Sequence, residues 1–263
     1  MSPNDTMVRL LSARSLDLTG HPLPVQALPG LQPEAIQQLE SSNPEAANAS
    51  LRELLQVSCG LTGTPLGDID FTGRWHPEEP LAIFRPCLSL AVDDGGRRWI
   101  AEVTDGSDLP GPVWCIFREP AVAVYVSDDL AEFVSKLRDR MRCGRVREWV
   151  RSLSAEARVI WTHGRALGAR SRNSLVRDQH LRSWIAALPP DTYVYDLRAP
   201  NITRGYPYAL AGPSSRIYRC GRLPVFAVSA WPACDGGMPR GDVAAFLTRS
   251  LHSGRAAMVP GTV

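Results

Sequence analysis

Histidine, serine and cysteine side chains would mark an enzyme, but in this sequence none of them stands in a catalytic pattern. His76, His163 and His180 could serve a metal or acid–base site, yet no H-E-x-x-H segment and no Cys/His pair at zinc spacing is present. The motif G-x-S-x-G, the Walker loop and a G-x-G-x-x-G turn are missing from the sequence as well. We therefore expect no catalytic residue, no metal ligand and no cofactor.

The six cysteines include no C-x-x-C pair. Cys87 and Cys115 lie in apolar, strand-like runs, where a free thiol behaves as a small hydrophobic residue. Cys59 follows a predicted helix, and it is a poor nucleophile there because the C-terminal end of a helix disfavours negative charge. We expect free thiols rather than a disulfide framework.

A set of carboxylates near Trp99 and Trp114 is the candidate binding surface. Its members are Asp93, Asp94, Glu102, Asp105, Asp108, Asp128 and Asp129. Exposed carboxylates of one sign would steer a basic partner and raise its association rate. The alternative is an ordinary solvated surface. The two tryptophans, on predicted neighbouring strands, are expected to be core residues.

Charge is distributed unevenly along the chain. Residues 1–140 contain 11 Lys and Arg against 20 Asp and Glu, whereas the remainder contains 18 arginines against seven acids. This asymmetry predicts two units with different surfaces, which either attract each other or serve different partners. Five arginines fall within 18 residues: Arg165, Arg170, Arg172, Arg177 and Arg182. They suggest an alternative function in nucleic-acid binding, although a solvated face or pairing with the acidic unit also explains them.

Apolar periodicity predicts an α+β order in the first half of the chain. Residues 1–27 are expected to form an N-terminal arm, followed by helices over 33–39 and 49–57. Residues 88–92 and 99–103 predict strands around the turn Asp93-Asp94-Gly95-Gly96. Further strands are predicted at 113–117 and 122–126. They are followed by a helix capped by Ser127, with apolar positions from Leu130 to Met141.

The second half also alternates between helix and strand patterns. A domain boundary is predicted at Cys143-Gly144-Arg145, which gives an arm (1–27), a first domain (28–143) and a smaller α+β domain (144–263). Helices are expected over 146–161, 175–188 and 242–252, and strands over 192–197 and 224–230. No stretch reaches the roughly 18 apolar residues of a membrane span, and no signal peptide precedes the arm. We therefore expect a cytoplasmic protein.

Residues 28–141 resemble the SUKH superfamily of Smi1/Knr4-like domains. The resemblance starts with LPGLQPEAIQQLE and LRELLQVSCGLTG, and continues through FRPCLSLAVDDGGRRWIAEV. It ends in GPVWCIFREPAVAVYVSDDLAEFVSKL, the most specific part, although the L-P-x-D-Y stretch often seen in the family is missing. Membership would imply an α+β domain with a mostly antiparallel sheet and helices on one side.

The same resemblance implies a binding role. Many such proteins are immunity proteins that neutralise a cognate secreted toxin, often a nuclease, in competition between bacteria that includes type VI secretion. We expect a non-enzymatic protein whose partner is such a toxin and which binds neither membrane nor nucleic acid. The alternative is a nucleic-acid-binding protein or enzyme acting through the arginine-rich half.

Overall fold

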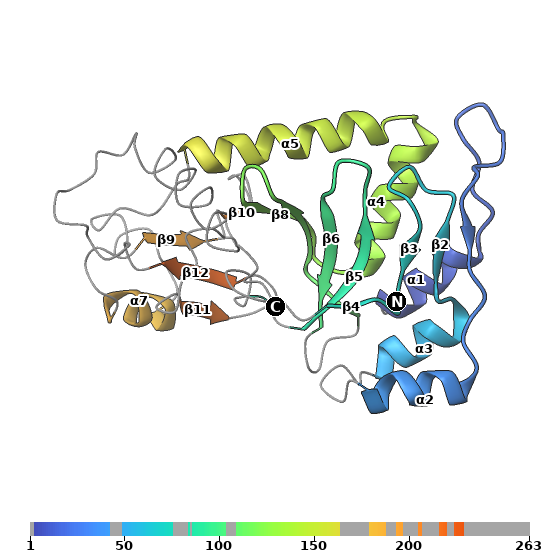
Figure 1. The fold of residues 1–263 in the computed structure, drawn as a ribbon, viewed down its shortest axis with the longest axis horizontal. Helices are drawn as coiled ribbons and strands as arrows, with labels where there is room; N and C mark the ends of the chain where they lie inside the picture. Colours follow the sequence, from blue (N-terminus) through green and yellow to red (C-terminus); the bar gives the residue numbers. More distant parts are fainter. Residues whose placement is uncertain are drawn as a thin grey trace, which may run out of the picture.

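The chain is an α+β protein built from antiparallel sheets and helices (Figure 1). The computed structural model describes residues 3–42, 49–75, 84, 86–103, 109–163, 179–187, 193–196, 205–206, 216–219 and 224–228. Its helices are α1 (Pro3–Ser12), α2 (Pro33–Ser42), α3 (Ala49–Val57), α4 (Leu130–Arg142), α5 (Val146–His163) and α7 (Gln179–Ala186).

A six-stranded antiparallel sheet is the largest element, with strand order β10-β8-β7-β6-β5-β4. Its strands are β4 (Arg74–Trp75), β5 (Cys87–Val92), β6 (Arg98–Glu102), β7 (Val113–Phe117), β8 (Val122–Ser127) and β10 (Gly205–Tyr206). Strands β7 and β8 are buried along their whole length, which explains their unbroken apolar sequences. The predicted strands at 88–92, 99–103, 113–117 and 122–126 are thereby confirmed.

The predicted hairpin turn between β5 and β6 is also confirmed. The Asp93 N–H donates to the Arg97 carbonyl at 3.1 Å, and the Gly96 N–H donates to the Asp93 carbonyl at 2.8 Å. Gly96 has a φ of 71°, a backbone conformation that residues with a side chain rarely adopt.

Two small sheets accompany the large one. They are β1-β2-β3 (Gln26–Ala27, Gly60–Thr62, Ile69–Asp70) and β11-β12-β9 (Arg216–Arg219, Pro224–Val228, Tyr193–Asp196).

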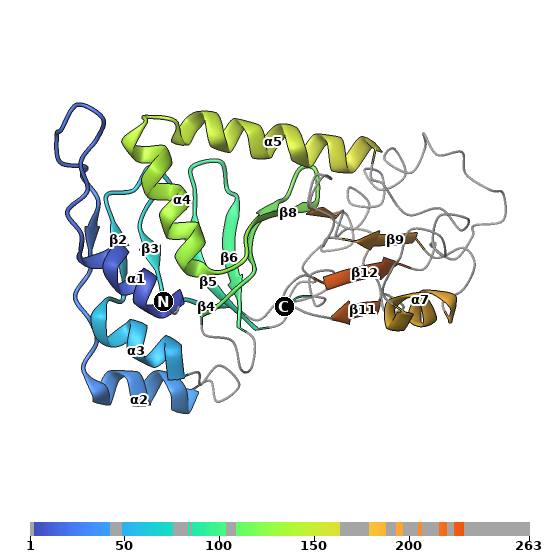
Figure 2. The same cartoon turned by 180° about the vertical axis from the view of Figure 1, so that it is seen from behind.

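Helix α4 lies on one face of the large sheet, and α5 crosses the end of the sheet where the β5–β6 and β7–β8 turns lie (Figures 1 and 2). The first turn of α4 is capped by Asp129, whose Oδ1 accepts the Glu132 N–H at 2.8 Å. Ser127, the predicted cap, instead donates its hydroxyl to the Asp129 carbonyl at 2.9 Å. The cap prediction was wrong by two residues because strand β8 continues to Ser127.

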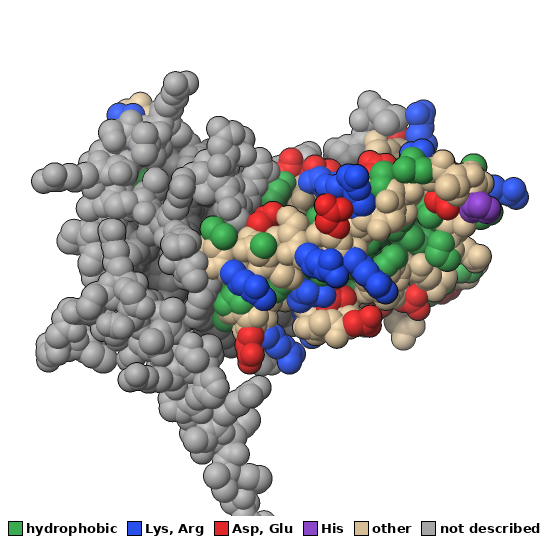
Figure 3. Space-filling view, turned by 90° about the horizontal axis from the view of Figure 1, so that it is seen from above, with side chains coloured by type: hydrophobic (Ala, Val, Ile, Leu, Met, Phe, Trp, Pro, Cys, Tyr) green, Lys and Arg blue, Asp and Glu red, His purple; other side chains and the backbone are tan. Residues whose placement is uncertain are grey.

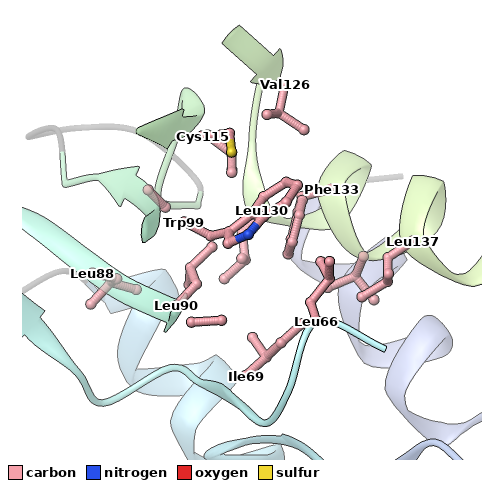
Figure 4. Packing of buried hydrophobic residues seen from close by; sticks show 14 of the residues in the cluster. Leu66, Ile69, Leu88, Leu90, Trp99, Cys115, Val126, Leu130, Phe133 and Leu137 are labelled. Atoms are coloured by element: carbon pink, nitrogen blue, oxygen red, sulfur yellow. The ribbon is translucent and has the colours of Figure 1, made fainter. Parts of the chain in front are cut away.

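The core lies between the sheet and helices α1–α5. Trp99 is fully buried there and contacts the rings of Phe133 (centroids 5.8 Å apart) and Trp149 (5.5 Å apart). Figure 4 shows its indole beside Leu130 and Phe133 of α4. Apolar residues at every third or fourth position of α4 predicted this buried face, and the structure confirms it.

The N-terminal segment is a packed helix, so the predicted arm is wrong. Met7 of α1 is completely buried and belongs to the core. Helix α1 contacts α3 and α4, and Asn4 Nδ2 donates to Glu53 Oε2 at 2.5 Å. Strand β1 pairs with β2. The prolines at 22, 24 and 29 suggested an extended tail, but the apolar spacing of Met7, Leu10 and Leu11 is helical.

The core also continues past the predicted boundary at residues 143–145. Leu153, Ala157 and Ile160 of α5 are buried in the same cluster as Trp99. Strand β10 pairs with β8, which brings Gly205 and Tyr206 to the edge of the large sheet. Gly144, with a φ of 66°, is a tight turn between two helices of one core rather than a linker.

The structure confirms the predicted helices and strands of the second half wherever it describes the residues concerned. Helix α7 falls within the predicted helix at 175–188, while β9 and β12 fall within the predicted strands. The predicted helix at 242–252 lies outside the described residues.

Candidate functional site

The candidate acidic residues are divided between the two ends of the large sheet. Asp93 and Asp94 lie in the β5–β6 turn, whereas Glu102 ends β6, and Asp128 follows β8. Because Ala101 pairs with Val113, and Val113 pairs with Ser127, the end of β6 lies beside the end of β8 and opposite the hairpin turn. Asp105 and Asp108 lie outside the described residues, in the β6–β7 connection. The structure therefore does not bring the set together as one surface.

Asp93 is a structural residue. Only 8% of it is exposed, and its carboxylate accepts hydrogen bonds from Arg97 Nε (2.8 Å), Trp99 Nε1 (3.0 Å) and the backbone of Gly95 (3.0 Å). Burial is the main cause that raises the pKa of the Cys115 thiol well above its usual value, and the negative charge of Asp93 is the second cause. The thiol is thus kept protonated, which removes Cys115 as a nucleophile.

Glu102 has the same role at the opposite end of the sheet. It is 1% exposed, and its Oε1 accepts the indole N–H of Trp114 at 3.0 Å. Trp99 and Trp114 are both fully buried, as predicted, but they lie on opposite faces because Trp99 pairs with Cys115, and Trp114 with Ile100. Each indole thus donates to one of the candidate acids. The prediction that Asp93 and Glu102 are exposed was wrong because a buried indole N–H needs an acceptor.

Asp128 and Asp129 are half-buried at the start of α4. The Asp128 N–H donates to Glu132 Oε2 at 2.6 Å, and Asp128 also accepts the phenol of Tyr125. Together with the Asp129 cap, this arrangement is similar to a capping box, except that Glu132 accepts the N–H of the residue before the cap. The Leu130 N–H donates to the Pro110 carbonyl at 2.9 Å, which joins the start of α4 to the segment before β7. Gly111 is required there, because a Cβ atom would lie 2.4 Å from the Asp128 carbonyl.

Among the described members of the set, only Asp94 is exposed. It lies at the hairpin end of the sheet, next to α5. This exposed acid is therefore separated from the described acids at the other end of the sheet, Asp128 and Asp129. A basic partner that contacted both groups would have to span the sheet.

A row of exposed arginines on α5 is the charged feature that sequence reasoning missed. Arg147, Arg151 and Arg158 follow one another at intervals of four and seven residues, and all three are exposed. Both intervals return to the same side of a helix, so the signal was present in the predicted helix at 146–161. The sequence analysis considered instead the five arginines at 165–182. Four of them lie outside the described residues, and Arg182, in α7, is exposed.

The residues considered for catalysis do not form a site in the part of the chain that the structure describes. No group of three or more His, Cys, Asp and Glu is placed to hold a metal ion among those residues. His76 lies outside them, whereas His163 ends α5 and His180 belongs to α7. Cys59, Cys87, Cys115 and Cys143 are free thiols. Within the same residues, no helix has the length and apolarity that crossing a bilayer requires.

Comparisons with protein-family models, curated proteins and solved structures found no match to this chain.

Proposed function

We propose that this chain is an immunity protein, which binds a cognate secreted toxin and blocks it without catalysing a reaction itself. The proposal rests on the resemblance of residues 28–141 to the SUKH superfamily. The observation that carries it is the order of elements in that segment. Helices α2 and α3 precede the antiparallel strands β5–β8, and the amphipathic helix α4 closes the unit.

The arrangement of the core supports this assignment. The resemblance implies a mostly antiparallel sheet with helices on one side, and α4 lies on one face of such a sheet. A rigid sheet with its helices can present loops to a protein partner without any catalytic group.

The end of the sheet opposite the hairpin is our candidate surface for a basic toxin. Asp128 and Asp129 lie there, and the sequence adds Asp105 and Asp108 in the connection between β6 and β7. Glu132, whose side chain is 41% exposed, also lies at the start of α4, but it pairs with Lys136 at 2.9 Å, so that pair adds no net charge. A basic nuclease would be steered toward this end by charge.

Co-expression tests the function directly. The proposal expects a secreted protein with a C-terminal toxin domain to be encoded next to this chain, and the probe is that domain, produced with and without this chain in a bacterial host. We expect this chain to restore growth and to co-elute with the toxin domain at a 1:1 ratio. A chain that neither restores growth nor forms the complex is not the immunity protein of that toxin.

Charge reversal tests the surface. In Asp105→Lys/Asp108→Lys, association with the toxin domain should slow about tenfold at low salt, and the difference should shrink as salt screens the charges. Asp94→Lys/Glu119→Lys changes the net charge by the same amount at two exposed acids of the hairpin end, and this matched control should leave the association rate within about twofold of the wild type. Stopped-flow fluorescence measures both rates. Equal slowing by both variants would assign the effect to net charge rather than to this end of the sheet.

A further inference from the structure

Helix α5 presents an arginine row at the end of the sheet that carries the hairpin turns. Arg147, Arg151 and Arg158 lie within about 40° of one another around the helix axis, and the row is about 16 Å long at 1.5 Å per residue. Figure 3 looks down on this end and shows Lys and Arg side chains gathered across the described part, with Asp and Glu side chains beside them.

One acid of the helix lies beside this row and the other lies away from it. Glu148 is three residues before Arg151 and about 60° from it around the axis, whereas Glu156 lies about 140° or more from each arginine of the row. Glu148 is 3.8 Å from Arg145, which precedes the helix, and Glu156 is half-buried. The residues between the arginines on the row's side are Ser154 and Ala155, so no carboxylate interrupts it.

The neighbouring turns add charges of both signs. Arg97 Nη1 donates to Ser154 Oγ at 3.4 Å, which ties the β5–β6 hairpin to the side of α5 that bears the row. Arg97 is paired with the buried Asp93, so that pair adds no net charge. At the hairpin end, Arg118 is exposed together with Asp94 and Glu119. The helix itself is therefore the source of the positive surface.

The residues on the row's side of α5 favour binding to a polyanion rather than to a protein surface. Protein interfaces usually centre on buried aromatic or aliphatic anchors, and the row offers only Ser154 and Ala155 between its arginines. Val159, which is 48% exposed, lies about 100° away from Arg158. Phosphate groups need no apolar anchor, because arginine forks bind their oxygens directly.

We propose that the exposed arginine row of α5 binds the phosphate backbone of a nucleic acid without reading its sequence. The row matches about five nucleotides of one strand at about 3.4 Å per nucleotide. The sequence that follows the row is also rich in arginine, since residues 159–182 contain five arginines and one acid. This inference departs from the expectation that the chain binds no nucleic acid. It concerns a different surface from the proposed toxin contact and stands independently of it.

The test uses the full chain and fluorescein-labelled 20-base-pair DNA and RNA duplexes of scrambled sequence. Fluorescence anisotropy should show binding at 50 mM salt. Three phosphate contacts predict that affinity falls roughly fortyfold between 50 and 200 mM salt. The variant Arg147→Gln/Arg151→Gln/Arg158→Gln should lose at least about tenfold in affinity at 50 mM salt, with a flatter dependence on salt.

A matched control removes the same charge from exposed positions on α1, α4 and the segment after α1. It is Arg9→Gln/Arg14→Gln/Arg140→Gln, and it should keep its affinity within about threefold. Circular dichroism establishes that both variants fold. Equal losses in the two variants, or no binding by the wild type at 50 mM salt, would overturn the proposal. So would a row variant that binds both duplexes normally but no longer binds the toxin domain, since the row would then be a protein interface.

Discussion

Asp93 and Glu102 illustrate, at the scale of single residues, how a buried indole determines the role of a carboxylate. Each acid accepts the N–H of a fully buried tryptophan at 3.0 Å. Asp93 additionally pairs with Arg97 at 2.8 Å. Taking a charge out of water is costly unless hydrogen bonds replace the lost water, and the Asp93 hairpin supplies several.

We predict that Asp93→Asn destabilises the protein by about 2–3 kcal/mol. One carboxylate oxygen accepts from Arg97 Nε and Trp99 Nε1 and the other from the Gly95 and Arg97 N–H groups, and an amide has only one acceptor oxygen. Urea denaturation monitored by tryptophan fluorescence measures the change. Asp94→Asn, at the neighbouring exposed position, is the control and should stay within about 0.5 kcal/mol of the wild type. Similar losses in both variants would show that the turn, and not the buried carboxylate, carries the stability.

Glu156 provides a pH-dependent prediction. Burial raises the pKa of its carboxyl, and a hydrogen bond with Ser152 lowers it by less. A carboxyl whose pKa is raised on folding stabilises the fold below its unfolded pKa of about 4.3, and this contribution is lost as pH rises through the folded value. Glu156→Gln should therefore be slightly more stable than the wild type at pH 7 and equal to it at pH 3.5.

Urea denaturation at the two pH values tests the Glu156 prediction. Glu148→Gln removes the same charge from the same helix at a side chain that is 75% exposed, and so controls for net charge. A gain of the same size at both pH values would contradict the assignment to burial.

At the scale of elements, helix α1 is held to the core by its contacts with α4. Arg138 of α4 donates to the Ala13 carbonyl at 2.6 Å and to the Ser15 hydroxyl, so α4 holds the chain just beyond α1. Met7 fills the space between α1 and the core. An element that buries a side chain completely and is anchored at its end is part of the folding unit.

Met7→Ala should therefore lower the free energy of unfolding by about 2–4 kcal/mol, the usual loss for a buried methionine. Differential scanning calorimetry would report a single transition at a lower Tm. Leu18→Ala removes an apolar side chain that is 71% exposed and should change little. If residues 1–27 were an arm, the two variants would behave alike.

For the whole molecule, the position of α5 decides where the first unit ends. Leu153 is 4% exposed and belongs to the cluster that contains Trp99. Helix α5 contacts β8, β10 and α4. The hydrophobic core thus includes residues on both sides of Gly144, and the two helices that meet there should unfold together with the sheet.

Leu153→Ala should destabilise the protein by about 2–4 kcal/mol and should speed the exchange of backbone amides in β5–β8. Hydrogen exchange read by mass spectrometry locates the effect. Val159→Ala, on the exposed side of the same helix, serves as the control. Faster exchange confined to α5 would mean that a separate domain begins after residue 143.

The sequence alone determined the elements whose pattern is local. Strands β5–β8, the turn at Asp93–Gly96 and helices α3, α4 and α5 follow from apolar periodicity and turn chemistry, which depend on neighbours within a few residues. Tertiary structure decided which faces meet. Burial of Met7, Asp93 and Glu102 depends on contacts with α4, Trp99 and Trp114, and no local pattern encodes them. The arginine row was visible in the spacing, but only packing showed that this side of α5 faces outward.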